Sequence, residues 1–172
     1  MKIIEYIKQH AAKAYEQICS IAGQPRFLFS NDPALVSDEY RYNYQYITGF
    51  NRLLKRGRIT TERIFYSFMF LERELESYLQ NHYKNKSFVL YIPADTAIPA
   101  FALTLVSYHG EEQLVGNVDL EQLIEWYKEN AYFDGITIIE EQQAAEEHDG
   151  QEDTNTEQNN GRGKRYIKLI QT

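Results

Sequence analysis

The sequence has very little cysteine and no long apolar run. Its 172 residues include one cysteine, Cys19, so an internal disulfide is excluded, and the apolar helical pattern around it favours a buried thiol over a reactive one. No run of about 18 apolar residues occurs, so no membrane span is expected. The first residues lack the charged-then-apolar pattern of a secretory signal. We therefore expect a cytoplasmic protein.

Motifs for catalysis and for cofactor binding are missing as well. There is no glycine-rich phosphate loop, no nucleophile elbow and no paired-cysteine zinc pattern. His109, with Asp95, Glu111, Glu112 and Asp119 in the neighbouring segments, is the nearest approach to a catalytic or metal cluster. These acids stand at turns, where acidic residues are common in any protein. We assign no catalytic residue, no metal ligand and no cofactor.

Charge is distributed unevenly behind the net value of -7. Residues 1–86 carry 13 Lys and Arg against 9 Asp and Glu, whereas residues 87–139 carry one Lys against 8 acids. Residues 140–163 carry another 8 acids and one Arg, and residues 164–172 carry three basic side chains. The N-terminal half is therefore basic and the following part acidic, which indicates two surfaces of opposite sign.

The most complete helical pattern covers residues 59–83. Thr60 can accept a hydrogen bond from a first-turn amide, and Ile59 and Ile64 have the spacing of a hydrophobic staple. We expect one wide face to be buried against strands between residues 88 and 106, with Arg58 and Arg63 solvated. The expected buried face consists of Ile64, Phe68, Leu71, Leu75 and Leu79, widened by Phe65, Met69 and Tyr78.

Two further helices are expected before residue 59. Residues 2–22 have helical spacing, and Gly23 followed by Pro25 is a typical helix end. Residues 36–56 fit two structures, because tyrosine at every second position from 40 to 46 suits a strand, whereas the wider apolar spacing suits a helix. We favour the helix, which would pair with the helix at 59–83 as an αα-hairpin.

Strand patterns dominate after residue 86. Residues 87–93 and 101–109 predict a hairpin, residues 113–118 a third strand and residues 136–140 a fourth. Between the last two, residues 119–130 predict a helix. Asp119 would be its N-cap, and Gln122 would complete a capping box.

The C-terminal part combines a polar segment with a final strand. Residues 140–163 hold almost no large apolar side chain and are predicted to be disordered. Residues 164–172 regain strand composition, and two interpretations fit them. They can return to the sheet beside residues 136–140, or they can be a strand offered to a partner by edge addition.

Together these patterns predict an α+β fold. An N-terminal three-helix layer would pack on a small antiparallel sheet of four to five strands with one further helix. We divide the chain into a helical half (1–86), a sheet with one helix (87–139), a disordered acidic segment (140–163) and a terminal strand (164–172).

The predicted αα-hairpin contains a cluster of basic residues close to tyrosines. The cluster consists of Arg52, Lys55, Arg56, Arg58 and Arg63. Basic side chains pair with phosphates and aromatic rings stack on bases, so single-stranded nucleic acid is a reasonable ligand. A solvated helix end is the alternative. The candidate binding residues are Tyr42, Tyr46, Arg52, Lys55, Arg56 and Arg58.

Three functions are compatible with the sequence. We favour a non-catalytic macromolecule-binding protein, of the adaptor, inhibitor or immunity type, that engages a protein partner through its acidic and tyrosine-rich surface. A basic partner would be complementary to this surface. The 14 tyrosines support this hypothesis, because tyrosine is enriched at interfaces. The alternative is a nucleic-acid-binding protein that uses the basic hairpin. The third hypothesis is a metal-dependent hydrolase or nuclease centred on His109.

Overall fold

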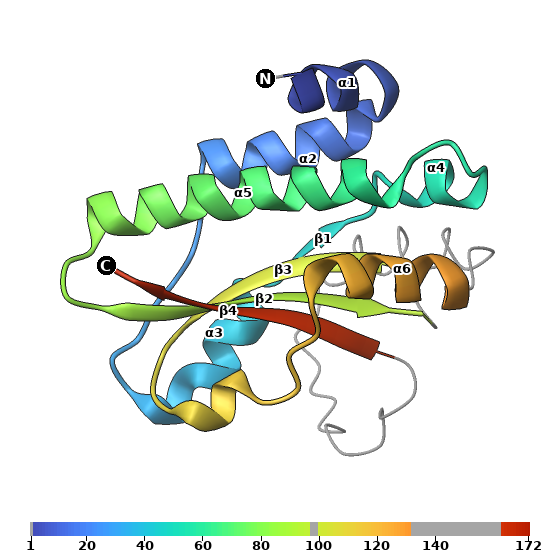
Figure 1. The fold of residues 1–172 in the computed structure, drawn as a ribbon. Helices are drawn as coiled ribbons and strands as arrows, with labels where there is room; N and C mark the ends of the chain where they lie inside the picture. The colour runs from blue at the N-terminus through green and yellow to red at the C-terminus, as the bar shows by residue number, and fades with distance from the viewer. Residues whose placement is uncertain (1, 97–99, 132–162) are drawn as a thin grey trace, which may run out of the picture.

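The computed structural model describes residues 2–96, 100–131 and 163–172. Six α-helices and four strands form within these residues, and the strands make one antiparallel sheet in the order β1-β3-β2-β4 (Figure 1). This arrangement confirms the predicted α+β class, with most of the helices preceding most of the sheet. None of the described helices is long and apolar enough to cross a membrane.

The elements are labelled in chain order. The helices are α1 (Lys2–His10), α2 (Ala12–Gly23), α3 (Val36–Tyr42), α4 (Asn51–Lys55), α5 (Thr61–His82) and α6 (Leu120–Asn130). Two 3-10 helices are η1 (Pro33–Leu35) and η2 (Glu111–Leu114). The strands are β1 (Gln45–Ile47), β2 (Ser87–Asp95), β3 (Ala100–Ser107) and β4 (Gly163–Gln171).

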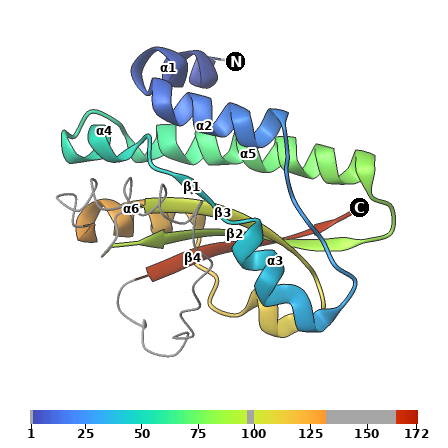
Figure 2. The same ribbon diagram turned by 180° about the vertical axis from the view of Figure 1, so that it is seen from behind.

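The longest helix, α5, crosses one face of the sheet and buries its predicted apolar stripe there. Ile64, Phe68, Leu71, Leu75 and Leu79 have no exposed surface and belong to one core cluster with residues of β2 and β3. The ring centroids of Phe68 and Phe101, a β3 residue, lie 5.2 Å apart. In Figures 1 and 2, α2 runs alongside α5 on the side away from the sheet.

The start of α5 also forms as predicted, whereas the predictions for two side chains of the helix are wrong. The Thr60 side chain accepts a hydrogen bond from the Arg63 N–H at 3.4 Å, and Ile59 and Ile64 are both buried. The prediction for Met69 is wrong, because this side chain is 37 % exposed on the outer side of the helix. The prediction for Arg63 is wrong too, since its guanidinium lies over the Tyr6 ring, 3.5 Å from the centroid.

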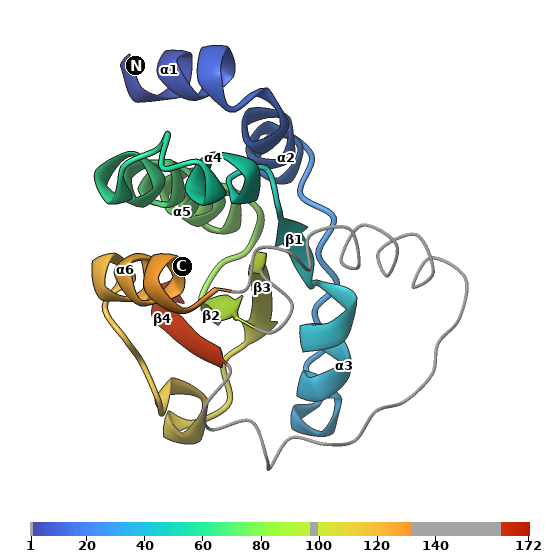
Figure 3. The same cartoon turned by 90° about the vertical axis from the view of Figure 1, so that its right-hand side faces the viewer.

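The opposite face of the sheet carries a smaller core. Val89, Tyr91, Val106 and Ile167 form it, and side chains from α3 and η2 pack against them. The Tyr40 ring on α3 lies 5.5 Å from the Tyr91 ring. Figure 3 shows α3 and α5 on opposite sides of the sheet, so helices cover both of its faces.

The predicted helix at residues 2–22 is two helices. Ala11 leaves the helical conformation, with φ -135 and ψ 53, and separates α1 from α2. The apolar positions are nevertheless those expected, because Ile7, Ala14, Ile18 and Ile21 are all buried. The break lets both halves bury their apolar side chains around α5, where one straight helix would run past it.

The single helix expected at residues 36–56 is wrong. It is replaced by α3, the short strand β1 and the one-turn helix α4, so the αα-hairpin does not form. The buried amide of Asn43 explains the interruption. Its oxygen accepts from the Leu28 N–H at 2.8 Å, and its nitrogen donates to the carbonyls of Leu28 at 2.9 Å and Leu105 at 2.7 Å. These bonds end α3 and direct the next residues into pairing with β3.

The strand predicted at residues 113–118 is also wrong. The segment begins in η2, and only Asn117 pairs with a strand, as an isolated bridge to Arg165. The Val118 N–H donates to the Arg165 carbonyl at 3.0 Å, and the Asn117 side chain accepts from the Ile167 N–H at 2.8 Å. The segment therefore covers part of the outer edge of β4 instead of adding a full strand.

The helix α6 follows where the sequence predicts it, but without the capping box. Asp119 precedes the first helical residue, yet no side-chain capping hydrogen bond is found at this described position. Leu120, Leu123, Ile124 and Tyr127 are buried, as their spacing requires.

The C-terminal strand β4 belongs to the sheet of this chain. It pairs antiparallel with β2 over its whole length, from Ser87 with Gln171 to Asp95 with Gly163. The predicted neighbour, residues 136–140, lies outside the described residues, as do residues 140–162 of the segment predicted to be disordered; Gly163 begins β4. Pro93 lies within the central strand β2, and pairing with β3 is interrupted at Ile92 and Pro93 because proline has no N–H to donate.

Leu75→Ala should destabilise the protein by roughly 2–5 kcal/mol, because it removes a fully buried side chain from the α5 stripe. Urea denaturation measures the change. A matched substitution at an exposed position of the same helix, Glu62→Ala, should change the free energy of unfolding by less than about 0.5 kcal/mol. A loss below about 1 kcal/mol for Leu75→Ala would contradict the burial of this face.

Candidate functional site

The structure divides the predicted binding residues between separate places. Tyr42 is 62 % exposed at the end of α3, and Tyr46 lies on β1 with its ring 5.1 Å from that of Tyr44. Arg52, Lys55 and Arg56 do come together, on α4 and just after it. Arg58 is exposed and lies outside the pocket that these three line.

Two further residues that the sequence did not connect with this cluster join it. His10 and Lys13, at the junction of α1 and α2, face Arg52, Lys55 and Arg56 across a cavity of about 820 Å³, which we call the basic pocket. The break at Ala11 places them there. Because this break was not predicted, the sequence pattern alone could not bring α1 and α4 together.

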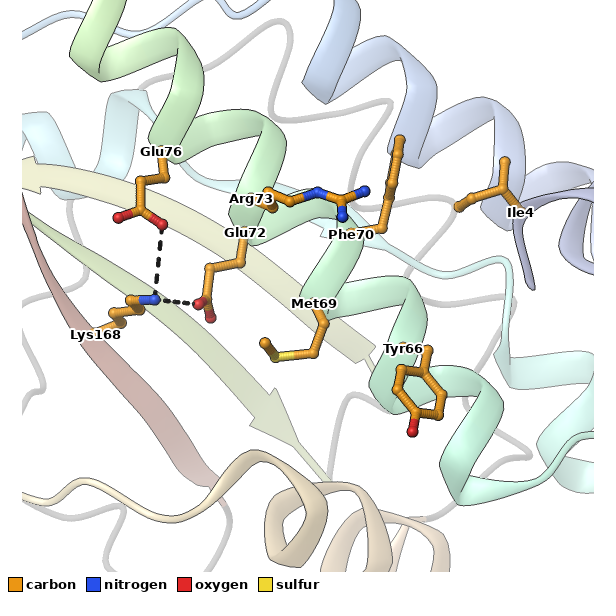
Figure 4. A pocket seen from close by; sticks show the side chains of 8 residues that line it. All are labelled: Ile4, Tyr66, Met69, Phe70, Glu72, Arg73, Glu76 and Lys168. Carbon is orange, nitrogen blue, oxygen red and sulfur yellow. Dashed lines mark hydrogen bonds and ion pairs between the residues drawn. The ribbon is translucent and has the colours of Figure 1, made fainter. Parts of the chain in front are cut away.

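A second concave surface lies along α5, between α1 and β4, and we call it the α5 groove. Its volume is about 440 Å³, and Figure 4 shows its side chains. They come from α1, α5 and β4 and are Ile4, Tyr66, Met69, Phe70, Glu72, Arg73, Glu76 and Lys168. Tyr66 and Met69 are 46 % and 37 % exposed and stand among the few large apolar side chains with that much surface in the described residues.

The spacing of these residues explains their common orientation. Tyr66, Met69, Arg73 and Glu76 recur at three- and four-residue intervals, so they lie along one stripe of the helix. This stripe is distinct from the buried one. The pattern is visible in the sequence, but only the observed direction of the core shows which stripe faces outward.

The floor of the groove is a polar contact between α5 and β4. Glu72 is only 3 % exposed and accepts hydrogen bonds from the Lys168 ammonium at 2.5 Å and the Tyr166 hydroxyl at 2.8 Å. Lys168 also pairs with Glu76 at 3.8 Å (Figure 4). The hydrogen bond to Glu72 raises the pKa of Lys168, and burial, followed by the bond to Glu72, raises the pKa of Tyr166.

An acidic stripe lies on α6, which packs against α5. Glu121, Glu125 and Glu129 recur every four residues on α6 and are all exposed. The Glu125 carboxylate accepts a hydrogen bond from the Thr61 hydroxyl, which fixes α6 against the first turn of α5. Figure 4 shows α6 running past the lower side of the groove.

Buried or clustered acids elsewhere have structural partners. Glu39 is 4 % exposed and accepts hydrogen bonds from the backbone N–H groups of Ser30 at 2.5 Å and Ser107 at 2.7 Å. His109 is exposed, and its backbone N–H donates a hydrogen bond to the side-chain oxygen of Gln113 at 2.5 Å. Across the ranges that the structure describes, no three His, Cys, Asp or Glu side chains converge on a possible metal position, so the hydrolase hypothesis gains no centre there.

Comparison with known proteins found no matching family model, no matching curated protein and no matching solved structure.

The polar floor predicts a loss of stability at alkaline pH. Lys168 and Tyr166 hold their protons more tightly in the folded chain than at the ordinary values of 10.5 and 10.0. So does Tyr40 on the opposite face of the sheet, because burial raises its pKa to about 12. The stability that these groups contribute is therefore complete below pH 10.0 and is lost as the pH rises through their folded values.

Urea denaturation at about pH 8, 10 and 11 should show this decline, and Tyr166→Phe should make it less steep because it removes one of the titrating groups. A free energy of unfolding that stays constant from about pH 9 to 11 would contradict the assignment.

Proposed function

We propose that this chain is a non-catalytic protein-binding protein, of the adaptor, inhibitor or immunity type, that holds a basic segment of a partner protein in the α5 groove. The observation that carries the proposal is the exposure of Tyr66 and Met69 at 46 % and 37 % in a concave surface. Large apolar side chains that line a surface depression are a common feature of binding sites.

The composition of the groove supports a protein ligand. Tyr66, Met69, Phe70 and Arg73 all belong to residue types that are enriched at protein interfaces. Tyrosine and methionine also adapt differently, since the tyrosine ring is rigid and the thioether chain can adjust to the shape of the ligand. A partner side chain would find an apolar anchor between them.

The charge beside the groove favours a basic partner. Exposed Glu121, Glu125 and Glu129 form the acidic stripe of α6, in which Glu125 also pairs with Lys128 at 3.8 Å. Opposite charge accelerates encounter and penalises acidic competitors. We therefore expect the affinity to fall as the salt concentration rises.

The floor makes the groove a preformed site. Glu72 connects α5 to β4 through two hydrogen bonds, and Lys168 holds Glu76 beside it. A surface that is fixed before binding loses little conformational entropy when the partner docks. The groove is small for a whole interface, so we assign it the anchor position, with the rest of the contact extending over α6.

Met69→Glu should abolish recovery of the partner from native lysate by the tagged chain, because it places a carboxylate where an apolar contact is expected. Val115→Glu is the matched control, since it places the same carboxylate on an apolar side chain that is 67 % exposed outside the groove and should leave recovery unchanged. Both variants should retain the wild-type melting temperature.

The pull-down is repeated after nuclease treatment and at about 0.05 and 0.5 M salt, a range over which surface charges become screened. A protein band that survives nuclease, weakens with salt and disappears with Met69→Glu supports the proposal. A band that Met69→Glu leaves unchanged, or one that nuclease removes, contradicts it.

A further inference from the structure

The basic pocket has a coherent charge that the proposed protein-binding function does not use. His10, Lys13, Arg52, Lys55 and Arg56 surround a cavity of about 820 Å³, and among the described residues that line it none carries a carboxylate. It shares no lining residue with the α5 groove. Cationic side chains repel one another, so a fold that gathers Lys13, Arg52, Lys55 and Arg56 around one cavity favours an anion there.

Buried contacts hold the α4 side of the pocket in place. Phe50 and Leu54 lie in the core, and the buried Asn51 accepts a hydrogen bond from the Tyr127 hydroxyl at 2.9 Å. With these residues facing inward, Arg52, Lys55 and Arg56 are left on the outside of the helical turn. The three cationic side chains therefore start from a rigid backbone.

A close approach of two backbones forms the base of the pocket. A Cβ atom at Gly49 would lie 2.1 Å from the Ala14 nitrogen, so only glycine fits against the first turn of α2. The Gly49 N–H donates to the Gln17 side chain at 2.9 Å, and the Gln17 amide donates to the Thr48 hydroxyl at 3.1 Å. These bonds join the segment before α4 to α2 and set the distance across the pocket.

The first turn of α2 adds partial positive charge. Ala11 and Ala12 line the pocket, and Ala11 has no side-chain oxygen with which to cap the first-turn amides. The amide end of a helix of this length favours an anion. It reinforces the Lys and Arg side chains of the pocket, which are the main attraction.

We propose that the basic pocket binds neighbouring phosphates of a nucleotide ligand, either along a single-stranded nucleic acid or in a nucleoside triphosphate. Arg52 and Arg56 have the planar donor fork that matches phosphate oxygens, and Lys13 and Lys55 supply point charges. The cavity is within the usual size range of ligand pockets, which leaves room for more than one phosphate group. Two adjacent phosphates also balance the two arginines better than a single carboxylate does.

Fluorescence anisotropy with a labelled single-stranded oligothymidine and with labelled ATP tests the proposal on the full chain. The pocket variant is Arg52→Glu with Arg56→Glu, and the control is Arg41→Glu with Lys84→Glu, two exposed basic residues outside the pocket. Both double variants change the net charge equally. Arg52→Gln with Arg56→Gln provides a milder pocket variant if charge reversal disturbs the fold.

For the wild-type chain we expect binding of at least one probe, with an affinity that falls as salt rises. The pocket variant should lose more than about tenfold in affinity, whereas the control should lose less than about threefold, because only the pocket variant removes direct phosphate contacts. With the oligonucleotide, the slope of log affinity against log salt should decrease in magnitude by about 1.4, at roughly 0.7 for each lost contact.

The two probes distinguish the sources of the phosphate. Binding of the oligonucleotide assigns the pocket to nucleic acid, and binding of ATP alone assigns it to a nucleotide. Binding of neither probe overturns the proposal, and so does an equal loss of affinity in the pocket and control variants. Because Met69 and Tyr66 lie outside the basic pocket, the outcome is independent of the protein partner proposed for the α5 groove.

Discussion

Burial of the inner face of α5 against the sheet is the interaction on which the rest of the structure depends. Its five stripe residues have no exposed surface, and burying each side chain of this size contributes about 1.5–3 kcal/mol. The same burial fixes the rotation of the helix about its axis. Tyr66 and Met69 are therefore held outward, and Glu72 is held at the boundary, where it meets Lys168 and Tyr166 of β4. The α5 groove is a consequence of the core.

The chain ends are brought into this arrangement by contacts that are distant in sequence. Glu72 connects α5 to a strand more than ninety residues later, and β4 pairs with β2 over its full length. At the other end, the break at Ala11 turns α1 away from α2 and opens the basic pocket beside α4. The molecule thus presents a groove with exposed apolar side chains next to an acidic helix and, lined by other residues, a cationic cavity. These two surfaces suit ligands of different chemistry.

Local signals in the sequence were enough for the elements whose burial is one-sided. The 3.6-residue period and the Thr60 cap predicted α5, and the alternation of residues 164–172 predicted β4. Where a long-range contact determines the secondary structure, the local patterns predicted it wrongly. Asn43 ends a helix by bonding to Leu105, which is 62 residues away, and Asn117 binds the edge of β4 from a segment with strand composition. The candidate sites were predicted in part for the same reason: Arg52, Lys55 and Arg56 cluster locally, whereas His10 and Lys13 reach them only through the fold.

Hydrogen–deuterium exchange of the full chain measures most directly whether α5 and β4 form one cooperative unit. The amides of Tyr166, Lys168 and Ile170 face β2, because those of the alternate residues face the outer edge. We expect these amides and those of Leu71 and Leu75 to exchange together, at the rate set by global unfolding. Exchange of the β4 amides at the rate of an unprotected peptide, while α5 stays protected, would contradict the role of β4 as an integral strand joined to α5.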